Sequence, residues 1–259
     1  MRTGLLRACA RQQPKRRQAV KSLCLLLFSG ASLYALERQT PWRSWTADYR
    51  TGINQRRVVM LADGTELTLN TNSAVNIEYS GQQRRIALLA GEIFIATGKD
   101  ARHRAFFVTT PYGSLQALGT RFTVRLHDSY ASAGVLQGAV AVLDDEGGQR
   151  LVLHPGEGAR YDRIALHRQA LPAYGGAWLN GMLVVRDMRL ADFLAELSRY
   201  SAHPLGCAPS LAKLRISGSY PLADVGAILD TLCASLQLRR NTVTRFWGRQ
   251  VVRIELAQR

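Results

Sequence analysis

Apolar and polar residues alternate along residues 58–161, and this period of two constrains the fold of the 259-residue chain more than any other feature. In the clearest segment, 120–126, Phe122, Val124 and Leu126 fall on one face of an extended strand. Further segments of this kind lie at 58–61, 66–69, 74–79, 85–89, 91–96, 105–110, 139–143 and 151–154. Short strands at this spacing, with no helical stretch among them, predict an antiparallel all-β domain of packed sheets.

After a connection at 172–176 the pattern changes to helical spacing. Leu190, Phe193, Leu194 and Leu197 stand at i, i+3, i+4 and i+7, which is the apolar face of a helix. A second apolar face follows at Val225, Ile228, Leu229, Leu232 and Leu236, and strands are expected at 182–185, 214–217, 236–243 and 251–256. We interpret the apolar faces as core packing against a sheet, not as a zipper. The all-β domain is therefore expected over 58–171 and a small α+β domain over 172–259.

The N-terminal segment has the charge pattern of a targeting or anchoring sequence. Residues 1–36 contain seven basic residues and no acidic one, and residues 22–36 carry no charge. Counted from Ala19, with Lys21 reaching the headgroups, the apolar stretch is marginally long enough to span a bilayer. We expect a short basic cytoplasmic tail at 1–18, a transmembrane helix at 19–36 and a linker at 37–57. A cleaved signal peptide has the same layout, and a buried core helix is the third alternative; the first two place the rest of the chain outside the cytoplasm.

The composition of residues 37–259 excludes several classes of function. This part contains 27 basic and 19 acidic residues, so its charge does not require a nucleic-acid partner. Its two cysteines, Cys207 and Cys233, either pair or stay as small buried thiols. No G-x-S-x-G motif occurs, and the histidines lack the spacing of metal ligands. We therefore expect no cofactor, no metal and no ordinary enzyme.

Several segments resemble the FecR family of periplasmic regulators. The resemblance is carried by 58–70 (VVMLADGTELTLN), 89–95 (LAGEIFI), 106–110 (FFVTT) and 117–124 (ALGTRFTV). Residues 178–184 (WLNGMLV) and 190–200 resemble the start of that family's C-terminal domain, which is similar to the secretin/TonB short N-terminal (STN) module. The resemblance covers about residues 52–256 and implies an all-β domain followed by an STN-like α+β domain.

The resemblance also implies a function and its partners. FecR-like proteins sit in the inner membrane and control an extracytoplasmic-function sigma factor. They respond to the N-terminal signalling domain of a TonB-dependent outer-membrane receptor that carries ferric siderophore. The contact with that domain would lie within residues 178–256. The family usually holds the sigma factor with a cytoplasmic N-terminal domain, whereas only residues 1–18 precede the apolar segment here. A structural periplasmic binding module without signalling output is the alternative.

A second implication of the resemblance is self-cleavage between Gly119 and Thr120. In this family the Gly-Thr bond is cut through an N-to-O acyl shift, with the Thr120 hydroxyl as nucleophile on the Gly119 carbonyl. A hydroxyl one bond away from the carbonyl has a high effective concentration, and His127 or His154 are candidate bases. The alternative is that Gly119-Thr120 is an ordinary turn that opens a strand.

Overall fold

The computed structural model describes residues 46–143, 149–171, 175–244 and 250–256. Residues 46–259 form one compact unit. The predicted tail at 1–18, the predicted transmembrane helix at 19–36 and most of the predicted linker at 37–57 lie outside the described residues. No helix in the described part of the chain is long and apolar enough to cross a membrane.

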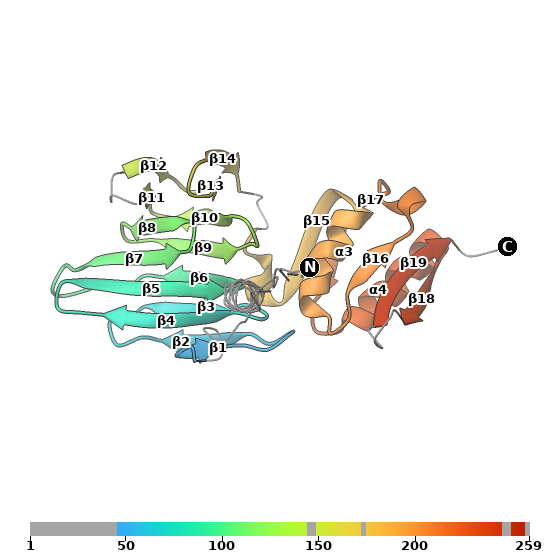
Figure 1. Cartoon of the computed structure of the whole chain (residues 1–259), viewed down its shortest axis with the longest axis horizontal. Coiled ribbons are helices and arrows are strands. Elements are labelled where there is room, and N and C mark those ends of the chain that lie inside the picture. The colour runs from blue at the N-terminus through green and yellow to red at the C-terminus, as the bar shows by residue number, and fades with distance from the viewer. Residues whose placement is uncertain (1–45, 144–148, 172–174, 245–249, 257–259) are drawn as a thin grey trace, which may run out of the picture. The chain divides into compact units, whose positions relative to one another are not determined.

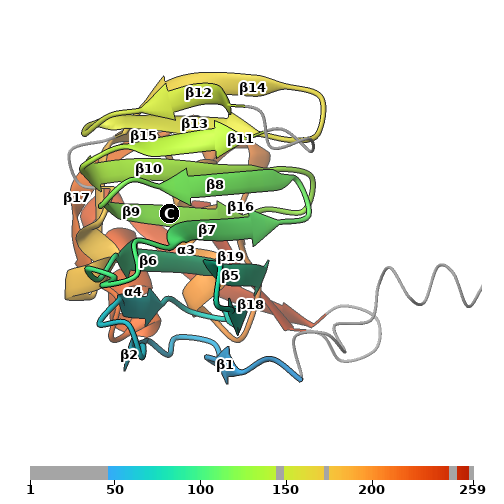
Figure 2. The same cartoon turned by 90° about the vertical axis from the view of Figure 1, so that its left-hand side faces the viewer.

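The first domain consists of two seven-stranded sheets (Figures 1 and 2). Sheet A has the order β1 (Tyr49–Arg50), β4 (Ala74–Tyr79), β5 (Gln83–Ala90), β7 (Ala105–Thr110), β8 (Gly113–Ala117), β11 (Val140–Leu143) and β12 (Gln149–Leu153). Sheet B has the order β14 (Leu166–Ala170), β13 (Glu157–Tyr161), β10 (Ala131–Gln137), β9 (Arg121–Leu126), β6 (Glu92–Ala96), β3 (Glu66–Leu69) and β2 (Arg57–Met60). The chain therefore moves repeatedly between the two sheets.

Alternate residues of both sheets form one apolar core. Sheet A contributes Ile86 and Val108, sheet B contributes Ile93 and Phe122, and all four are fully buried. In β9 the predicted inward face is correct, because Phe122 and Val124 are buried while Leu126 packs at the margin of the core. The predicted all-β domain is thus confirmed as two sheets that enclose a shared core.

Three features of this domain differ from the prediction. β5 and β7 pair in parallel, because β6, which separates them in the sequence, lies in the other sheet. The domain also begins before residue 58, since β1 pairs with β4. Five strands were not predicted: β1, β8, β10, β13 and β14. Several of them, such as β10 with its sequence ASAGVLQ, have small residues in place of a clear alternation.

The C-terminal part has the expected α+β composition. Its elements are β15 (Met182–Arg189), α3 (Leu190–Leu197), β16 (Leu205–Cys207), β17 (Arg215–Pro221), α4 (Val225–Leu236), β18 (Leu238–Thr244) and β19 (Gln250–Leu256), with short 3-10 helices η1 (Ala177–Asn180), η2 (Ser198–Tyr200) and η3 (Pro209–Leu211). The strands form a pair, β15–β17, and a three-stranded sheet, β16–β19–β18. β16 was not predicted, and it pairs in parallel with β19.

Both helices bury the faces that the sequence predicted. In α3 the buried residues are the four of the i, i+3, i+4, i+7 pattern. α4 begins where the Asp224 carboxylate accepts the backbone N–H of Ala227 at 3.0 Å, a side-chain N-cap. It ends at Gln237, which adopts a left-handed conformation. The helix faces and Ile254 of β19 form a second apolar core.

Sheet B is buried on both of its faces along β6. Ile93 and Ile95 point into the core between the sheets, whereas Glu92 and Phe94 point the other way and are also buried. Phe94 belongs to the same apolar cluster as the residues of α3. The outer face of β6 is therefore covered by the C-terminal part of the chain.

Candidate functional site

Gly119 and Thr120 lie where the chain crosses from sheet A to sheet B, between β8 and β9. Gly119 has a φ of +78°, a conformation that favours glycine. Thr120 is only 3% exposed, and its Oγ1 is buried without a hydrogen-bond partner among the described residues. A buried hydroxyl normally finds a partner, so this one is an exception that calls for an explanation. The structure therefore places an unpaired hydroxyl beside the predicted scissile bond.

The backbone of Thr120 is held at both ends by Thr97, which follows β6. The Thr120 N–H donates to Thr97 Oγ1 at 2.8 Å, and the Thr97 N–H donates to the Thr120 carbonyl at 3.0 Å. The Thr97 hydroxyl lies 3.3 Å from the same carbonyl oxygen. Sequence reasoning missed Thr97, because a contact between residues so far apart in the chain leaves no local pattern.

A second glycine makes room for the Gly119 carbonyl. Gly138 lies at the return crossing from β10 in sheet B to β11 in sheet A, with a φ of +80°. A Cβ on Gly138 would lie 2.3 Å from the carbonyl oxygen of Gly119 and 2.9 Å from Cγ2 of Thr120. Next to this contact, the Leu118 N–H donates to the Ala139 carbonyl at 3.0 Å. The two crossings therefore pack against each other.

Neither candidate base lies in contact with Thr120. His127 comes after the far end of β9, and six residues of strand place it about 20 Å away. Its ring stacks on Tyr130 with 4.1 Å between centroids, and its Nε2 lies 3.1 Å from the Ser132 hydroxyl. His154 bonds through its backbone N–H to Glu157, and no hydrogen bond joins its ring to Thr120 in the part that the structure describes.

A polar network links the outer face of sheet B to η2. Arg199 Nη2 lies 2.6 Å from Glu92 Oε2, and both side chains are largely buried. Asn70 Nδ2 donates to the same Glu92 oxygen at 3.0 Å and to the hydroxyl of Tyr200 at 2.9 Å. The Thr71 hydroxyl donates to the carbonyl of Arg199 at 2.9 Å. We call Asn70, Glu92, Arg199 and Tyr200 the polar seam.

Glu196 of α3 extends the polar seam to a second arginine. It accepts from Arg199 and, at 2.8 Å, from Arg125 of β9. Burial raises the pKa of the Glu196 carboxyl, but the two guanidinium groups outweigh it, so the pKa lies below its usual value. Burial likewise raises the pKa of Tyr200, to about 12. Glu196 and Tyr200 thus keep their normal charge near neutral pH.

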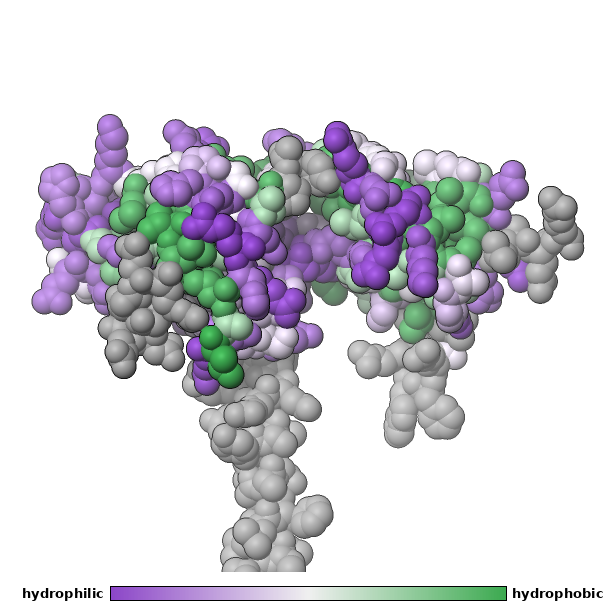
Figure 3. Space-filling model, turned by 90° about the horizontal axis from the view of Figure 1, so that it is seen from above, coloured by the Kyte–Doolittle hydropathy of each residue, from purple (hydrophilic) through white to green (hydrophobic). Residues whose placement is uncertain are grey.

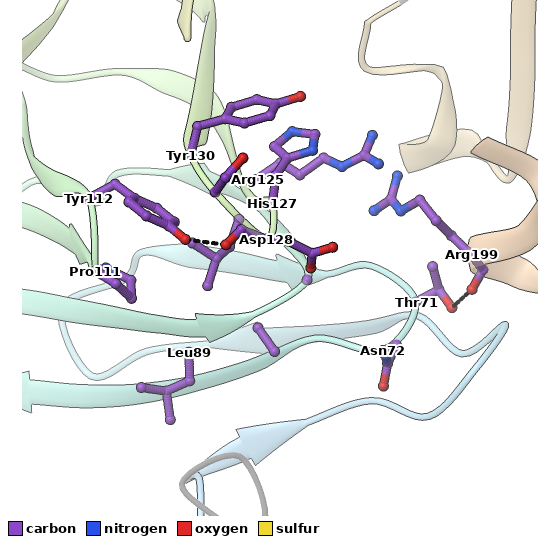
Figure 4. A pocket seen from close by; sticks show the side chains of 14 residues that line it. Thr71, Asn72, Leu89, Pro111, Tyr112, Arg125, His127, Asp128, Tyr130 and Arg199 are labelled. Atoms are coloured by element: carbon purple, nitrogen blue, oxygen red, sulfur yellow. Dashed lines mark hydrogen bonds between the residues drawn. The ribbon is translucent and has the colours of Figure 1, made fainter. Parts of the chain in front are cut away.

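A pocket of about 720 Å³ lies beside the polar seam (Figure 4). Figure 4 shows the guanidinium groups of Arg125 and Arg199 pointing toward one another from opposite sides, with Tyr112, His127 and Tyr130 along one wall. Burial and the nearby Arg125 and Arg199 lower the pKa of His127 to about 4, so its ring is neutral at pH 7. Because both arginines are already paired with carboxylates, the pocket has no evident excess of positive charge.

The C-terminal part offers a free sheet edge at β18. This strand pairs with β19 on one side and with no other described strand on its second side. Arg239, Arg240, Asn241 and Thr242 are exposed there. An unpaired edge is the feature that a partner uses for strand addition. It lies within the predicted contact region, 178–256.

Cys207 of β16 and Cys233 of α4 are free thiols in the structure. Burial raises the pKa of both, which makes them inert rather than reactive. Within the described residues, no group of His, Cys, Asp and Glu is placed to hold a metal ion.

Taken together, these features define a two-part protein: a β-domain with a buried Gly-Thr crossing, joined by a polar seam to a small α+β domain. Residues 47–141 match the model of the FecR family, described as "FecR protein". This match covers the greater part of the β-domain, and for these residues the resemblance to the FecR family seen in the sequence is confirmed.

The fold extends beyond that match. Two crystal structures of a candidate anti-sigma factor from Parabacteroides distasonis, at 2.50 and 1.65 Å resolution, align with TM-scores of 0.62 and 0.63. They are 20% and 19% identical to this chain, and each alignment covers 81% of it and 98% or 99% of the crystallised chain. At this identity the likeness shows a shared fold that includes both parts of the chain. The chain has no match among the curated proteins that were searched.

Proposed function

We propose that this chain is a membrane-anchored periplasmic regulator that controls an extracytoplasmic-function sigma factor. The observation that carries the proposal is the FecR match over residues 47–141. The shared fold with a protein described as a candidate anti-sigma factor supports it. The face seen in Figure 3 is mostly hydrophilic, with apolar residues in smaller areas, as expected for a domain in water.

The regulatory role is tested with transcriptional reporters driven by the extracytoplasmic-function sigma factors of the source organism. Deleting the gene should change reporter activity in one direction, and restoring the full chain should reverse the change. Unchanged reporter activity would contradict the proposal and favour a structural binding module without signalling output.

The proposed location places the tail at 1–18 in the cytoplasm, the helix at 19–36 in the inner membrane and the described domains in the periplasm. The one-sided charge of the first 36 residues supports this orientation. Alkaline phosphatase fused after residue 60 should be active and should sediment with membranes, whereas a fusion after residue 18 should be inactive. An inactive fusion at residue 60 would refute the location. An active but soluble one would indicate a cleaved signal peptide.

We propose further that the signalling domain of a TonB-dependent receptor docks on the free edge of β18. Successive N–H groups of a strand alternate in direction, so of Asn241 and Thr242 one donates toward β19 and the other toward the free edge. Asn241→Pro and Thr242→Pro should therefore differ: one should unfold the sheet, and the other should keep the fold but lose the partner. Titration calorimetry with purified signalling domains of the source organism's TonB-dependent receptors measures the loss. Normal binding by the variant that stays folded would refute edge docking.

A second candidate function is self-processing at Gly119-Thr120. The buried, unpaired Oγ1 of Thr120 favours it over an ordinary turn. Purified protein on a denaturing gel should show fragments of about 13 and 15 kDa, at ~110 Da per residue. Thr120→Ala should abolish them and Thr120→Ser should keep them. Fragments that persist in Thr120→Ala would indicate an outside protease, and a full-length band alone would leave only a turn.

A further inference from the structure

The Thr97 side chain is hydrogen-bonded to the predicted scissile peptide. Its hydroxyl oxygen lies 2.8 Å from the amide nitrogen of Thr120, which is the nitrogen that must leave when the bond is cut. Its backbone N–H fixes the carbonyl on the other side of Thr120 at 3.0 Å. Both backbone groups of Thr120 are thus engaged, whereas its hydroxyl has no partner in the part of the chain that the structure describes.

We propose that Thr97 is a positioning residue for cleavage of the Gly119-Thr120 bond, an inference that rests on the self-processing proposed above. In the first step Oγ1 of Thr120 bonds to the carbonyl carbon of Gly119, and the carbon–nitrogen bond breaks. The hydroxyl proton passes to the amide nitrogen, which becomes a free amine. Water then hydrolyses the ester, which gives a Gly119 carboxylate and restores the Thr120 hydroxyl.

Thr97 assists the first step by geometry. An attack by Oγ1 on the preceding carbonyl closes a five-membered ring and requires particular backbone and side-chain torsion angles at Thr120. The two hydrogen bonds to Thr97 restrict the backbone torsion angles, so the reacting atoms are ordered before the reaction begins. The Thr97 hydroxyl also stands next to the nitrogen at the moment when that nitrogen gains a proton.

Gly138 explains how the carbonyl of Gly119 is placed for this attack. Any side chain at Gly138 would occupy the space of the carbonyl oxygen, since a Cβ there would lie 2.3 Å from it. The carbonyl therefore rests against bare backbone on one side, while Thr97 holds the following residue. Gly138 thus adjoins the carbonyl oxygen of the peptide between Gly119 and Thr120, and Thr97 binds the nitrogen of the same peptide.

The test follows the full chain, pulse-labelled in a cell-free synthesis reaction, so that cleavage is timed from the moment of synthesis. Thr97→Val removes the hydroxyl but keeps the shape and the backbone N–H, and it should slow the appearance of fragments by about tenfold or more. Thr97→Ser restores the hydroxyl and should cleave near the wild-type rate. Thr123→Val removes another buried threonine hydroxyl, from β9, and should cleave at the wild-type rate.

Treatment with hydroxylamine shows whether Thr97 acts before the ester forms or in its later hydrolysis. Hydroxylamine attacks an ester, so it should raise the fragment yield of the wild type more than that of Thr97→Val if Thr97 acts before the ester forms. Restoration of wild-type yield in Thr97→Val by hydroxylamine would overturn the proposal. If Thr97→Val does not fold, as judged by circular dichroism, Thr97→Ala replaces it.

Failure of the proposed role of Thr97 can be distinguished from failure of the proposed self-processing. Cleavage of Thr97→Val at the wild-type rate would remove Thr97 from the reaction and leave self-processing intact. A wild-type chain that never yields fragments would overturn self-processing, and the role of Thr97 with it.

Discussion

The arginine of the polar seam illustrates how much one buried side chain contributes. Arg199 binds Glu92 and Glu196, and its own burial lowers its pKa less than these two carboxylates raise it. A charge removed from water is stabilised only while its partners remain. Loss of the arginine would therefore leave the buried Glu92 carboxylate without its cation, while Glu196 would keep only Arg125.

We expect Arg199→Met to lower the free energy of unfolding by about 3 kcal/mol or more, the cost of breaking a buried ion pair. Urea titration followed by circular dichroism measures it. The matched control is Arg189→Met, which breaks the exposed pair with Asp192 and should change stability by about 0.5 kcal/mol at most. Equal effects of the two substitutions would contradict the role assigned to the seam.

His127 makes stability depend on pH. Because burial and the nearby arginines lower its pKa to about 4, the unfolded chain binds a proton that the folded chain does not between about pH 6.5 and 4. Stability should therefore fall as the pH drops through this window. The full shift corresponds to about 3 kcal/mol, and screening at a half-buried site reduces it to about 1 kcal/mol.

His127→Asn should remove this dependence. Between pH 7 and pH 4.5 its free energy of unfolding should therefore fall by about 1 kcal/mol less than that of the wild type. Denaturation midpoints at both pH values measure the difference. His167→Gln removes an exposed histidine of β14 and serves as the control, with the wild-type slope expected. A wild-type slope in His127→Asn would show that another group titrates.

At the scale of elements, two crossings between the sheets, one at Gly138 and one between β12 and β13 at Gly156, depend on glycine for different reasons. Gly138 and Gly156 have nearly the same φ, +80° and +82°. A Cβ at Gly156 would have no atom within 4 Å, whereas one at Gly138 would meet the carbonyl of Gly119. Substitutions at these two glycines therefore separate the free-energy cost of the left-handed backbone conformation from that of steric crowding.

Gly156→Ala should cost about 1–2 kcal/mol, the penalty of a left-handed conformation. Gly138→Ala should cost about 1–3 kcal/mol more, because β9 or β11 must shift to admit the methyl group. Thermal and urea unfolding of both variants provide the comparison. Equal losses would mean that the crossing at Gly138 has room to adjust.

The elements also mark what the sequence alone can predict. Strong alternation in β9 and the helical spacing in α3 and α4 each report a residue's own environment, so these elements and their buried faces were predicted correctly. β10 and β13 were missed because small residues and glycine give them no clear alternation.

The residues of the candidate site also fall into those that a local motif predicts and those that only the fold brings together. Gly119 and Thr120 are adjacent, so a local motif found them. Thr97 and Gly138 contact that motif from distant segments, and the link between Glu92 and Arg199 joins two domains. Such pairings depend on the register of the sheets and on the packing of the domains, which a single sequence does not display.

For the whole molecule, the position of the Gly119-Thr120 bond determines how its two halves interact. A break there divides sheet A between β8 and β11 and sheet B between β6 and β9. Both new boundaries are antiparallel strand pairs, and the apolar core continues across them. The polar seam also joins the halves, because Glu92 lies in the first and Arg199 in the second.

Residues 1–119 and 120–259, expressed from separate genes in one cell, should therefore co-purify and elute together in native buffer. They should separate only in denaturant. Val124→Asp places a charge in the shared core and should abolish the association, whereas the exposed substitution Lys213→Asp should not. Separate elution of the unmodified halves would contradict the shared core.

The paired crossings at Gly119 and Gly138 also determine what happens under mechanical tension. In an intact chain, a pull between the two ends travels along covalent bonds, and the chain responds by unfolding. In a chain cut at Gly119, the same pull can pass only through the strand pairs β8–β11 and β6–β9 and the contacts around them. The lifetime of such a joint follows the rate of forced unfolding, not the equilibrium stability. Cleavage of this one peptide bond would thus replace a covalent connection with a non-covalent one. Such a connection withstands thermal motion but releases residues 120–259 under load.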